Sequence, residues 1–122
     1  MTPRIPTIDI HCHLATPAAS EILRPHLLPE YHPYSYFMGQ DSLDQNQIMF
    51  PTIVDALHNP EDRFGHMDAM GIDVQGLATF VSEYGYWAPG KVGAESARVQ
   101  NNNLAQAVAN HPDRFSALGA TV

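Results

Sequence analysis

Residues 7–14, TIDIHCHL, decide the fold of this chain. Across residues 5–13, apolar side chains alternate with Asp9, His11 and His13, which is the two-residue period of a β-strand with two unlike faces. A loop containing proline follows directly and favours the end of the strand. We therefore predict a first strand over residues 5–13, with the two histidines side by side on one face near its C-terminal end.

Helix and strand signals alternate in the second half of the chain. Asn59 as N-cap, with Pro60 at the first helical position, is typical of a helix start, and Gly71 suits the helix end. The apolar run after Gly71 is typical of a strand. The expected elements are a helix over residues 60–70, a strand over 73–81, a helix over 94–110 and a third strand opening at about residue 115.

Residues 15–58 are rich in proline and in aromatic side chains, and they show no sustained period. Thr16 as N-cap and Pro17 at the first helical position predict a short helix over residues 17–24. We interpret the remainder as one long loop, and its many aromatic residues favour an ordered loop.

Strands that alternate with helices predict an α/β architecture with parallel pairing through right-handed crossovers. The last expected strand lacks the helix that a parallel sheet needs to cover it, and three strands make a poor free-standing sheet. We therefore expect residues 1–122 to be the N-terminal segment of one larger, incomplete domain.

Charge and composition exclude several classes of partner. Thirteen acidic against six basic residues give a formal charge of -7, which repels nucleic-acid backbones and anionic membrane surfaces. No stretch is long and apolar enough to span a bilayer, and the first residues lack the apolar core of a secretory signal. The single cysteine, Cys12, cannot form an internal disulfide, so we expect a cytoplasmic protein.

The pair His11 and His13 is a candidate half of a metal site. Two imidazoles on one strand face can occupy adjacent coordination positions of one divalent ion, with zinc as the expected ion, while the other ligands come from elsewhere. The alternative is a pair of ordinary polar residues at a strand end. Cys12 faces the opposite side as a small buried residue, and Asp9 either orients a ligand or fixes the strand.

Three stretches together carry a family resemblance: TIDIHCHL, DRFGHMDAMGIDVQGLATF and NNNLAQAVANHPDRFSALGATV. In this order they resemble the amidohydrolase-related superfamily, in the branch of 2-amino-3-carboxymuconate 6-semialdehyde decarboxylase and its relatives. The resemblance implies the N-terminal portion of a metal-dependent (β/α)8 TIM-type barrel, with about three strands and two main helices present. It also implies a metal-ligand role for His11 and His13, with the remaining ligands beyond residue 122.

The activity that this resemblance implies is decarboxylation of an unsaturated or aromatic carboxylic acid. The branch places a substrate-binding arginine just before the segment matched by PTIVDALHNP, whereas this chain has no arginine from residue 25 to 62. That difference argues against the same substrate. A metal-dependent hydrolase of a lactone, ester or amide is one alternative, and an inactive truncated fragment that persists alone or as a homo-oligomer is another.

Other candidate residues lie outside the histidine pair. Tyr84, Tyr86 and Trp87 follow the second strand, so Trp87 is a candidate substrate contact as well as a residue of simple loop packing. Arg63 and Asp68 are interpreted as solvated surface or helix-packing charges. Nothing in the sequence places His58 or His66 near a metal.

Overall fold

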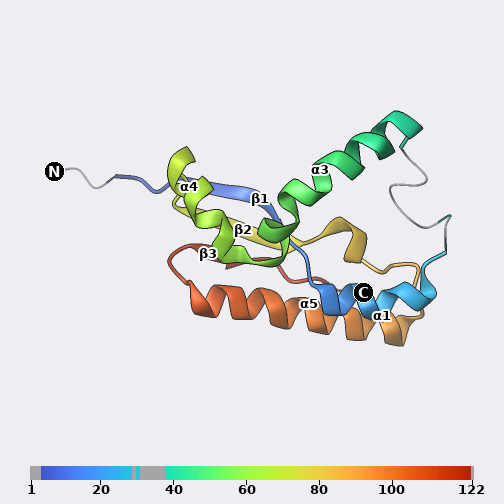
Figure 1. Cartoon of the computed structure of the whole chain (residues 1–122). Coiled ribbons are helices and arrows are strands. Elements are labelled where there is room, and N and C mark those ends of the chain that lie inside the picture. Colours follow the sequence, from blue (N-terminus) through green and yellow to red (C-terminus); the bar gives the residue numbers. More distant parts are fainter. Residues whose placement is uncertain (1–3, 29, 31–37, 122) are drawn as a thin grey trace.

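The computed structural model describes residues 4–28, 30 and 38–121 (Figure 1). Helices and strands alternate along the second half of the chain, which confirms the predicted α/β class. The elements are β1 (Ile8–Leu14), α1 (Pro17–Leu23), η1 (Arg24–His26), α3 (Gln40–His58), η3 (Pro60–Arg63), α4 (Phe64–Met70), β2 (Val74–Thr79), η4 (Val81–Glu83), α5 (Gly90–Asn110) and β3 (Phe115–Ala117).

The three strands form one parallel sheet in the order β1-β2-β3. Ile8 lies opposite Val74 at one end of β1, and Leu14 lies opposite Thr79 at the other. The register shifts between Asp9 and Cys12, because three steps along β1 there match two steps along β2. The carboxyl ends of β1 and β2 therefore meet at one edge of the sheet, where the loops that follow them begin.

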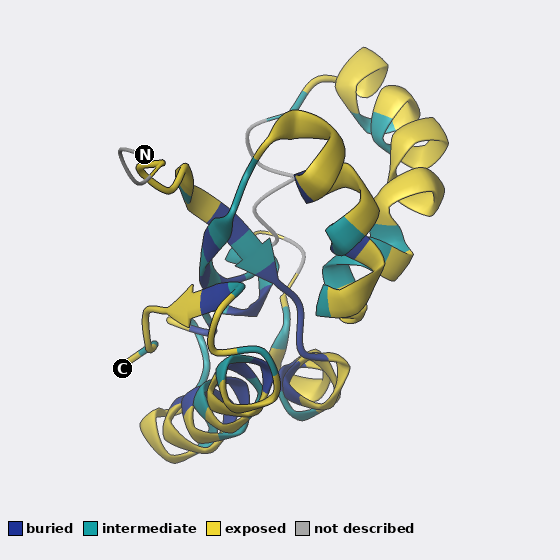
Figure 2. Ribbon diagram, turned by 90° about the vertical axis from the view of Figure 1, so that its left-hand side faces the viewer, coloured by how far each residue is buried: buried dark blue, intermediate teal, exposed yellow. Residues whose placement is uncertain are grey.

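One hydrophobic core joins the sheet to α4 and α5. Leu77 of β2 is fully buried, and the same core holds Met67 of α4, Leu104 of α5 and Phe115 of β3. Figure 2 shows the buried residues gathered between the strands and the helices, with α5 turning its buried positions toward the sheet. This packing holds the strand ends, and the side chains on them, in fixed positions.

The predicted strands and the later helices are confirmed with small shifts at their ends. The helix expected over 60–70 is a short 3₁₀ turn, η3, that continues into α4, and Gly71 ends it in the left-handed conformation with φ 69°. The last helix begins at Gly90, four residues earlier than predicted. Thr16 precedes α1 as expected, although its hydroxyl does not cap that helix.

The long loop predicted within residues 15–58 is wrong for its second part, because α3 occupies Gln40–His58. Pro51 lies inside this helix, where a proline removes one backbone hydrogen bond and normally interrupts the element. No residue of α3 is buried by the other described parts of the chain (Figure 2). The aromatic residues of positions 31–37, on which the ordered-loop prediction depends, lie outside the described residues.

Candidate metal site at the ends of the first two strands

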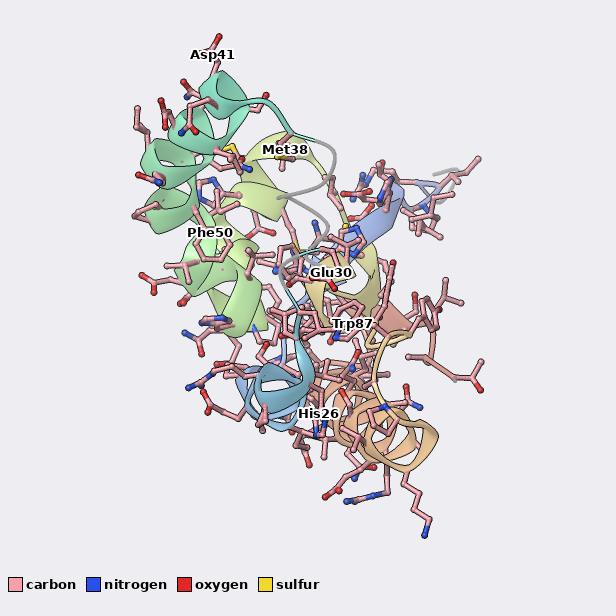
Figure 3. The ribbon with its side chains drawn as sticks, turned by 90° about the vertical axis from the view of Figure 1, so that its right-hand side faces the viewer. His26, Glu30, Met38, Asp41, Phe50 and Trp87 are labelled. Carbon is pink, nitrogen blue, oxygen red and sulfur yellow. The ribbon has the colours of Figure 1, made fainter. Side chains whose placement is uncertain are left out.

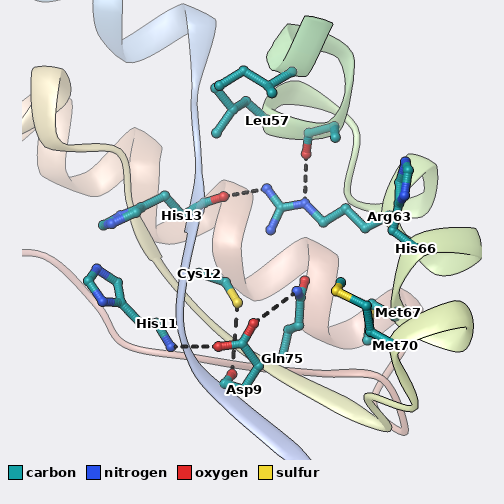
Figure 4. Close-up of a pocket in the computed structure, with 12 residues that line it drawn as sticks. Asp9, His11, Cys12, His13, Leu57, Arg63, His66, Met67, Met70 and Gln75 are labelled. Atoms are coloured by element: carbon teal, nitrogen blue, oxygen red, sulfur yellow. Dashed lines mark hydrogen bonds between the residues drawn. The ribbon is translucent and has the colours of Figure 1, made fainter. Parts of the chain in front are cut away.

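His11 and His13 lie on the same side of β1, as their spacing predicts. Their ring centroids are 5.2 Å apart, with the ring planes at 73° to each other. In Figure 4 both imidazoles point away from the side chains of Cys12 and Gln75, which lie on the other side of the strand. Two imidazoles at this separation suit adjacent positions around one metal ion.

The imidazole of His13 is fixed by the neighbouring strand. Its Nδ1 lies 2.8 Å from the carbonyl oxygen of Thr79, the last residue of β2. A carbonyl oxygen only accepts hydrogen bonds, so Nδ1 carries the proton and Nε2 keeps its lone pair. This is the arrangement in which a metal-binding histidine donates its other ring N–H to a backbone carbonyl. The residues present therefore fit a divalent metal ion on the histidine side of the sheet.

Asp9 does not share the histidine side, contrary to the sequence prediction. It lies opposite the buried Gln75, before the register shift in β1, and its carboxylate accepts hydrogen bonds from the amide of Gln75 at 3.4 Å and from the backbone N–H of His11 at 3.2 Å. The shift moves Asp9 to the face that α4 and α5 cover. Of the two roles left open for Asp9, the geometry supports fixing the strand.

Cys12 is a small buried side chain, as predicted. It is 8% exposed and belongs to the hydrophobic core. Burial, together with its interaction with Asp9, raises the pKa of the Cys12 thiol to about 12. The thiol is therefore protonated at neutral pH and is not a thiolate ligand.

The two imidazoles are not part of a larger ligand cluster in the described part of the chain. Across residues 4–28, 30 and 38–121, no three His, Cys, Asp or Glu side chains are grouped so that they hold a metal ion. His66 is exposed on α4, across β1 from the imidazoles in Figure 4. The Nε2 atom of His111 forms a hydrogen bond with the carboxylate of Glu61 at 2.8 Å. Further ligands, where a metal binds, have to come from outside these residues.

Arg63 is buried, which corrects its interpretation as a solvated charge. It is 9% exposed and lines a cavity of about 330 Å³ beside β1, whose other lining residues include His11, His13 and His66 (Figure 4). Its guanidinium donates to the backbone carbonyl oxygens of Ala56, at 2.6 Å, and of His13. Burial lowers the pKa of Arg63 from its usual high value, but an arginine stays protonated at neutral pH.

A second cleft lies between α3 and the end of β2. Its volume is about 720 Å³, and it is lined by residues of α3 together with Met38 and Phe80. Phe80 also packs edge-on against His13, with ring centroids 6.3 Å apart, so the cleft adjoins the histidine pair. Sequence reasoning missed this cleft because it did not predict α3, although Phe50 and Ile53 of that helix supply much of its apolar wall.

Trp87 lies in the loop between η4 and α5 (Figure 3). It is half-buried, and it lines neither of the two cavities described above. Its indole Nε1 is buried without a hydrogen-bond partner among the described residues. A substrate contact for Trp87 stays a prediction.

Glu83 is a buried carboxylate that sequence reasoning missed. Its oxygens accept hydrogen bonds from the backbone N–H of Thr16, at 2.8 and 2.9 Å, and from the hydroxyl of Ser20 at 2.8 Å. Its own backbone carbonyl accepts from Gln100 of α5 at 2.7 Å. Burial raises the pKa of Glu83 from its ordinary value, against the effect of the hydrogen bonds from Thr16 and Ser20. The residue ties the turn after β1 to the turn after β2.

Comparison with curated proteins gives one enzyme of the predicted branch, while no family model matches the chain. The chain is 32% identical over 62 residues to 2-amino-3-carboxymuconate-6-semialdehyde decarboxylase of Dictyostelium discoideum. The match covers 51% of this chain and 17% of that protein. The chain thus spans a small part of the length of this relative.

Comparison with solved structures gives further decarboxylases. The 5-carboxyvanillate decarboxylase of Novosphingobium aromaticivorans, complexed with manganese and 4-hydroxy-3-methoxy-5-nitrobenzoic acid, aligns with a TM-score of 0.69 and 25% identity over 96% of this chain and 34% of that one. The 5-carboxyvanillate decarboxylase of Sphingomonas paucimobilis aligns with a TM-score of 0.68 and 20% identity over 95% of this chain and 34% of that one. Each match takes up about a third of the solved chain.

The described helices include none that is long and apolar enough to cross a membrane.

The parallel sheet, the histidine pair at its carboxyl edge and the matched proteins all agree with the family resemblance of the sequence. In sequence and in fold, the chain resembles the N-terminal segment of amidohydrolase-related decarboxylases of the 2-amino-3-carboxymuconate 6-semialdehyde decarboxylase branch.

Proposed function

We propose that this chain contributes to a metal-dependent decarboxylase of an aromatic or unsaturated carboxylic acid. The observation that carries the proposal is the bond from Nδ1 of His13 to the carbonyl oxygen of Thr79, which leaves Nε2 available beside His11. The similarity to decarboxylases in sequence and in structure supports the reaction class. In this proposal His11 and His13 are metal ligands, and the chain is the first part of one barrel domain.

The proposed metal is a divalent ion, and zinc is our specific expectation, because imidazole is a favoured ligand of that borderline-soft ion. The matched structure from Novosphingobium aromaticivorans contains manganese, which supports a divalent metal in general. Such an ion lowers the pKa of bound water and neutralises charge on an oxygen ligand. His11 and His13 would hold it at the carboxyl edge of the sheet, where enzymes of barrel folds have their active sites.

The cleft beside Phe80 supports a substrate with an apolar or aromatic body. Its walls are largely hydrocarbon and aromatic side chains from α3, and Phe80 connects it to His13. Cavities of this kind suit flat apolar rings, with a few polar groups to orient them. Because Phe80 contacts both the cleft and His13, a ring seated there lies next to the proposed metal ligands.

The carboxylate of such a substrate has no free arginine in the described part of this cleft. Residues 25–62 contain none, and the guanidinium of Arg63 is bonded to two backbone carbonyls on the far side of β1. We therefore propose a substrate other than 2-amino-3-carboxymuconate 6-semialdehyde. We also propose a cytoplasmic site of action, since the single cysteine is a buried, protonated thiol.

Product analysis tests the reaction class. The complete metal-loaded domain, of which this chain is the proposed first part, is incubated in D2O with candidate hydroxylated benzoic acids, and separately with lactones. We expect release of carbon dioxide and one solvent deuterium on the ring carbon that lost the carboxylate. His11→Ala and His13→Ala are expected to abolish turnover, while His66→Ala, which changes an exposed histidine across β1, leaves it unchanged. Ring opening with incorporation of water would contradict decarboxylation and support the hydrolase alternative.

A further inference from the structure

Arg63 joins the end of helix α3 to the end of strand β1. Its Nε donates to the carbonyl oxygen of Ala56 at 2.6 Å, and its Nη2 donates to the carbonyl oxygen of His13. The side chain is 9% exposed, and none of the ion pairs among the described residues includes it. This buried cation is therefore compensated by carbonyl oxygens instead of a carboxylate.

The end of α3 explains why a cation is stable at this place. The helix ends at His58, so its last carbonyl groups have no partners within the helix. The backbone N–H of Asn59 donates to one of these carbonyls, and the backbone N–H of Ala15 donates to the carbonyl of Leu57 at 2.9 Å. The carbonyl of Ala56 then accepts from Arg63. The partial negative charge at a helix C-terminus also stabilises a guanidinium.

The same guanidinium fixes the backbone of a proposed metal ligand. The carbonyl of His13 accepts from Arg63, and the ring of His13 donates to the carbonyl of Thr79. His13 is thus held at two points, one on its backbone and one on its imidazole. When both are fixed, the direction of the Nε2 lone pair is fixed as well.

We propose that Arg63 is a positioning residue for the metal site. It sets the direction in which His13 presents Nε2, and it links that direction to α3, whose other residues line the apolar cleft beside Phe80. Nothing in this role requires Arg63 to touch metal or substrate, because it lies across β1 from the imidazoles (Figure 4). The proposal depends on the metal role of His13, and the experiment below separates the two.

Arg114 is a matched control for Arg63. Its Nε donates to the carbonyl of Asp73 at 3.0 Å, and its Nη2 donates to the carboxylate of Asp68 at 2.8 Å. It also packs over the ring of Phe64, 4.9 Å from the ring centre. These contacts lie before the amino end of β2, whereas the histidines lie at the carboxyl end of β1. Its replacement removes similar bonds without changing the surroundings of His13.

The experiment compares Arg63→Met with Arg114→Met in the intact chain. Two quantities are measured: the tautomer of His13 by imidazole ¹⁵N NMR without metal, and the affinity for Mn²⁺ from the paramagnetic broadening of the His11 and His13 ring signals. For Arg63→Met we expect a partial shift of His13 away from the Nδ1–H tautomer and about a tenfold loss of affinity, the usual effect of losing a residue that orients a ligand. Arg114→Met is expected to change neither quantity.

Arg63→Lys keeps the charge but lacks the planar guanidinium that reaches two carbonyls at once, so we expect its affinity for Mn²⁺ to fall about threefold. This variant decides the question if Arg63→Met does not fold. Wild-type values of tautomer and affinity in the Arg63 variants, or an equal loss in Arg114→Met, would overturn the proposal. If Mn²⁺ broadens neither histidine in the wild-type protein, the proposed metal role fails, while the metal-free tautomer still tests whether Arg63 positions His13.

Discussion

The two histidines of β1 are held in different ways. The imidazole of His13 is half-buried, bonds the carbonyl of Thr79 and packs against Phe80, whereas His11 is exposed. A ligand with a fixed ring loses little conformational freedom on binding, and an exposed ring has to be ordered by the metal. We therefore interpret His13 as the preorganised member of the pair.

Glu83 gives a prediction for the pH dependence of stability. Its pKa is raised in the folded protein by burial, so above pH 4.5, its ordinary pKa, the native state holds this proton more tightly than the unfolded state. The contribution of Glu83 to the free energy of unfolding therefore falls as the pH rises from 4.5 toward its raised pKa. Glu83→Gln keeps an acceptor for Thr16 and adds a donor for Ser20, so we expect this fall to disappear.

Urea unfolding from pH 4.5 to 8 measures this effect as the difference between wild type and variant. Glu95→Gln, which changes an exposed residue of α5, serves as the control and should keep the wild-type dependence. An unchanged slope in Glu83→Gln would show that the carboxylate does not titrate with a raised pKa.

Helix α3 is the element that sequence reasoning missed, because the prolines and aromatic residues of positions 15–58 favoured a loop. Leu43, Phe50, Val54 and Leu57 follow a helical spacing of seven, four and three residues, but the proline between them favours a loop. The register shift in β1 had a similar effect on a smaller scale, because strict alternation placed Asp9 on the wrong face. The missed helix and the misplaced Asp9 have one physical cause. In each case neighbouring segments stabilise a local irregularity, a proline within a helix or a register shift within a strand, that the residue pattern does not encode.

Pro51→Ala is expected to stabilise α3. The change restores a backbone N–H inside the helix and removes the proline ring, so we expect a gain of about 1 kcal/mol or more in the free energy of unfolding, with greater helicity. Circular dichroism and thermal unfolding measure both quantities. Pro60→Ala is the control, because Pro60 begins η3, where proline is tolerated. A loss of helicity in Pro51→Ala would contradict the presence of α3.

Replacing either of two glycines in the α4 region by alanine should change the stability of the protein, in opposite directions. Gly71 has φ 69°, a left-handed conformation that costs a residue with a side chain about 1 kcal/mol or more, so Gly71→Ala should destabilise the protein. Gly65 lies within α4 with open space around its Cα, so Gly65→Ala should stabilise by about 0.5–1 kcal/mol. Chemical denaturation compares the pair, and effects of the same sign would contradict the ending of α4 at Gly71.

At the scale of the whole molecule, the sequence predicted the parallel α/β order, the position of each strand and the pairing of His11 with His13 on one face. It did not predict the burial of Arg63 or of Glu83, because each depends on carbonyl or N–H groups of distant segments. It also did not predict the apolar cleft, which exists only where α3 lies against the end of β2. Contacts between distant segments were therefore the main part that pattern reasoning lacked.

The histidine pair is the central claim, and zinc titration of the intact chain followed by imidazole ¹⁵N NMR tests it most directly. We expect the Nε2 signals of His11 and His13 to shift together and those of His26, His58 and His66 to remain in place. Binding should be weak, because two imidazoles leave the other coordination positions to water. Zinc that shifts the other histidines and leaves His11 and His13 unchanged would contradict the account.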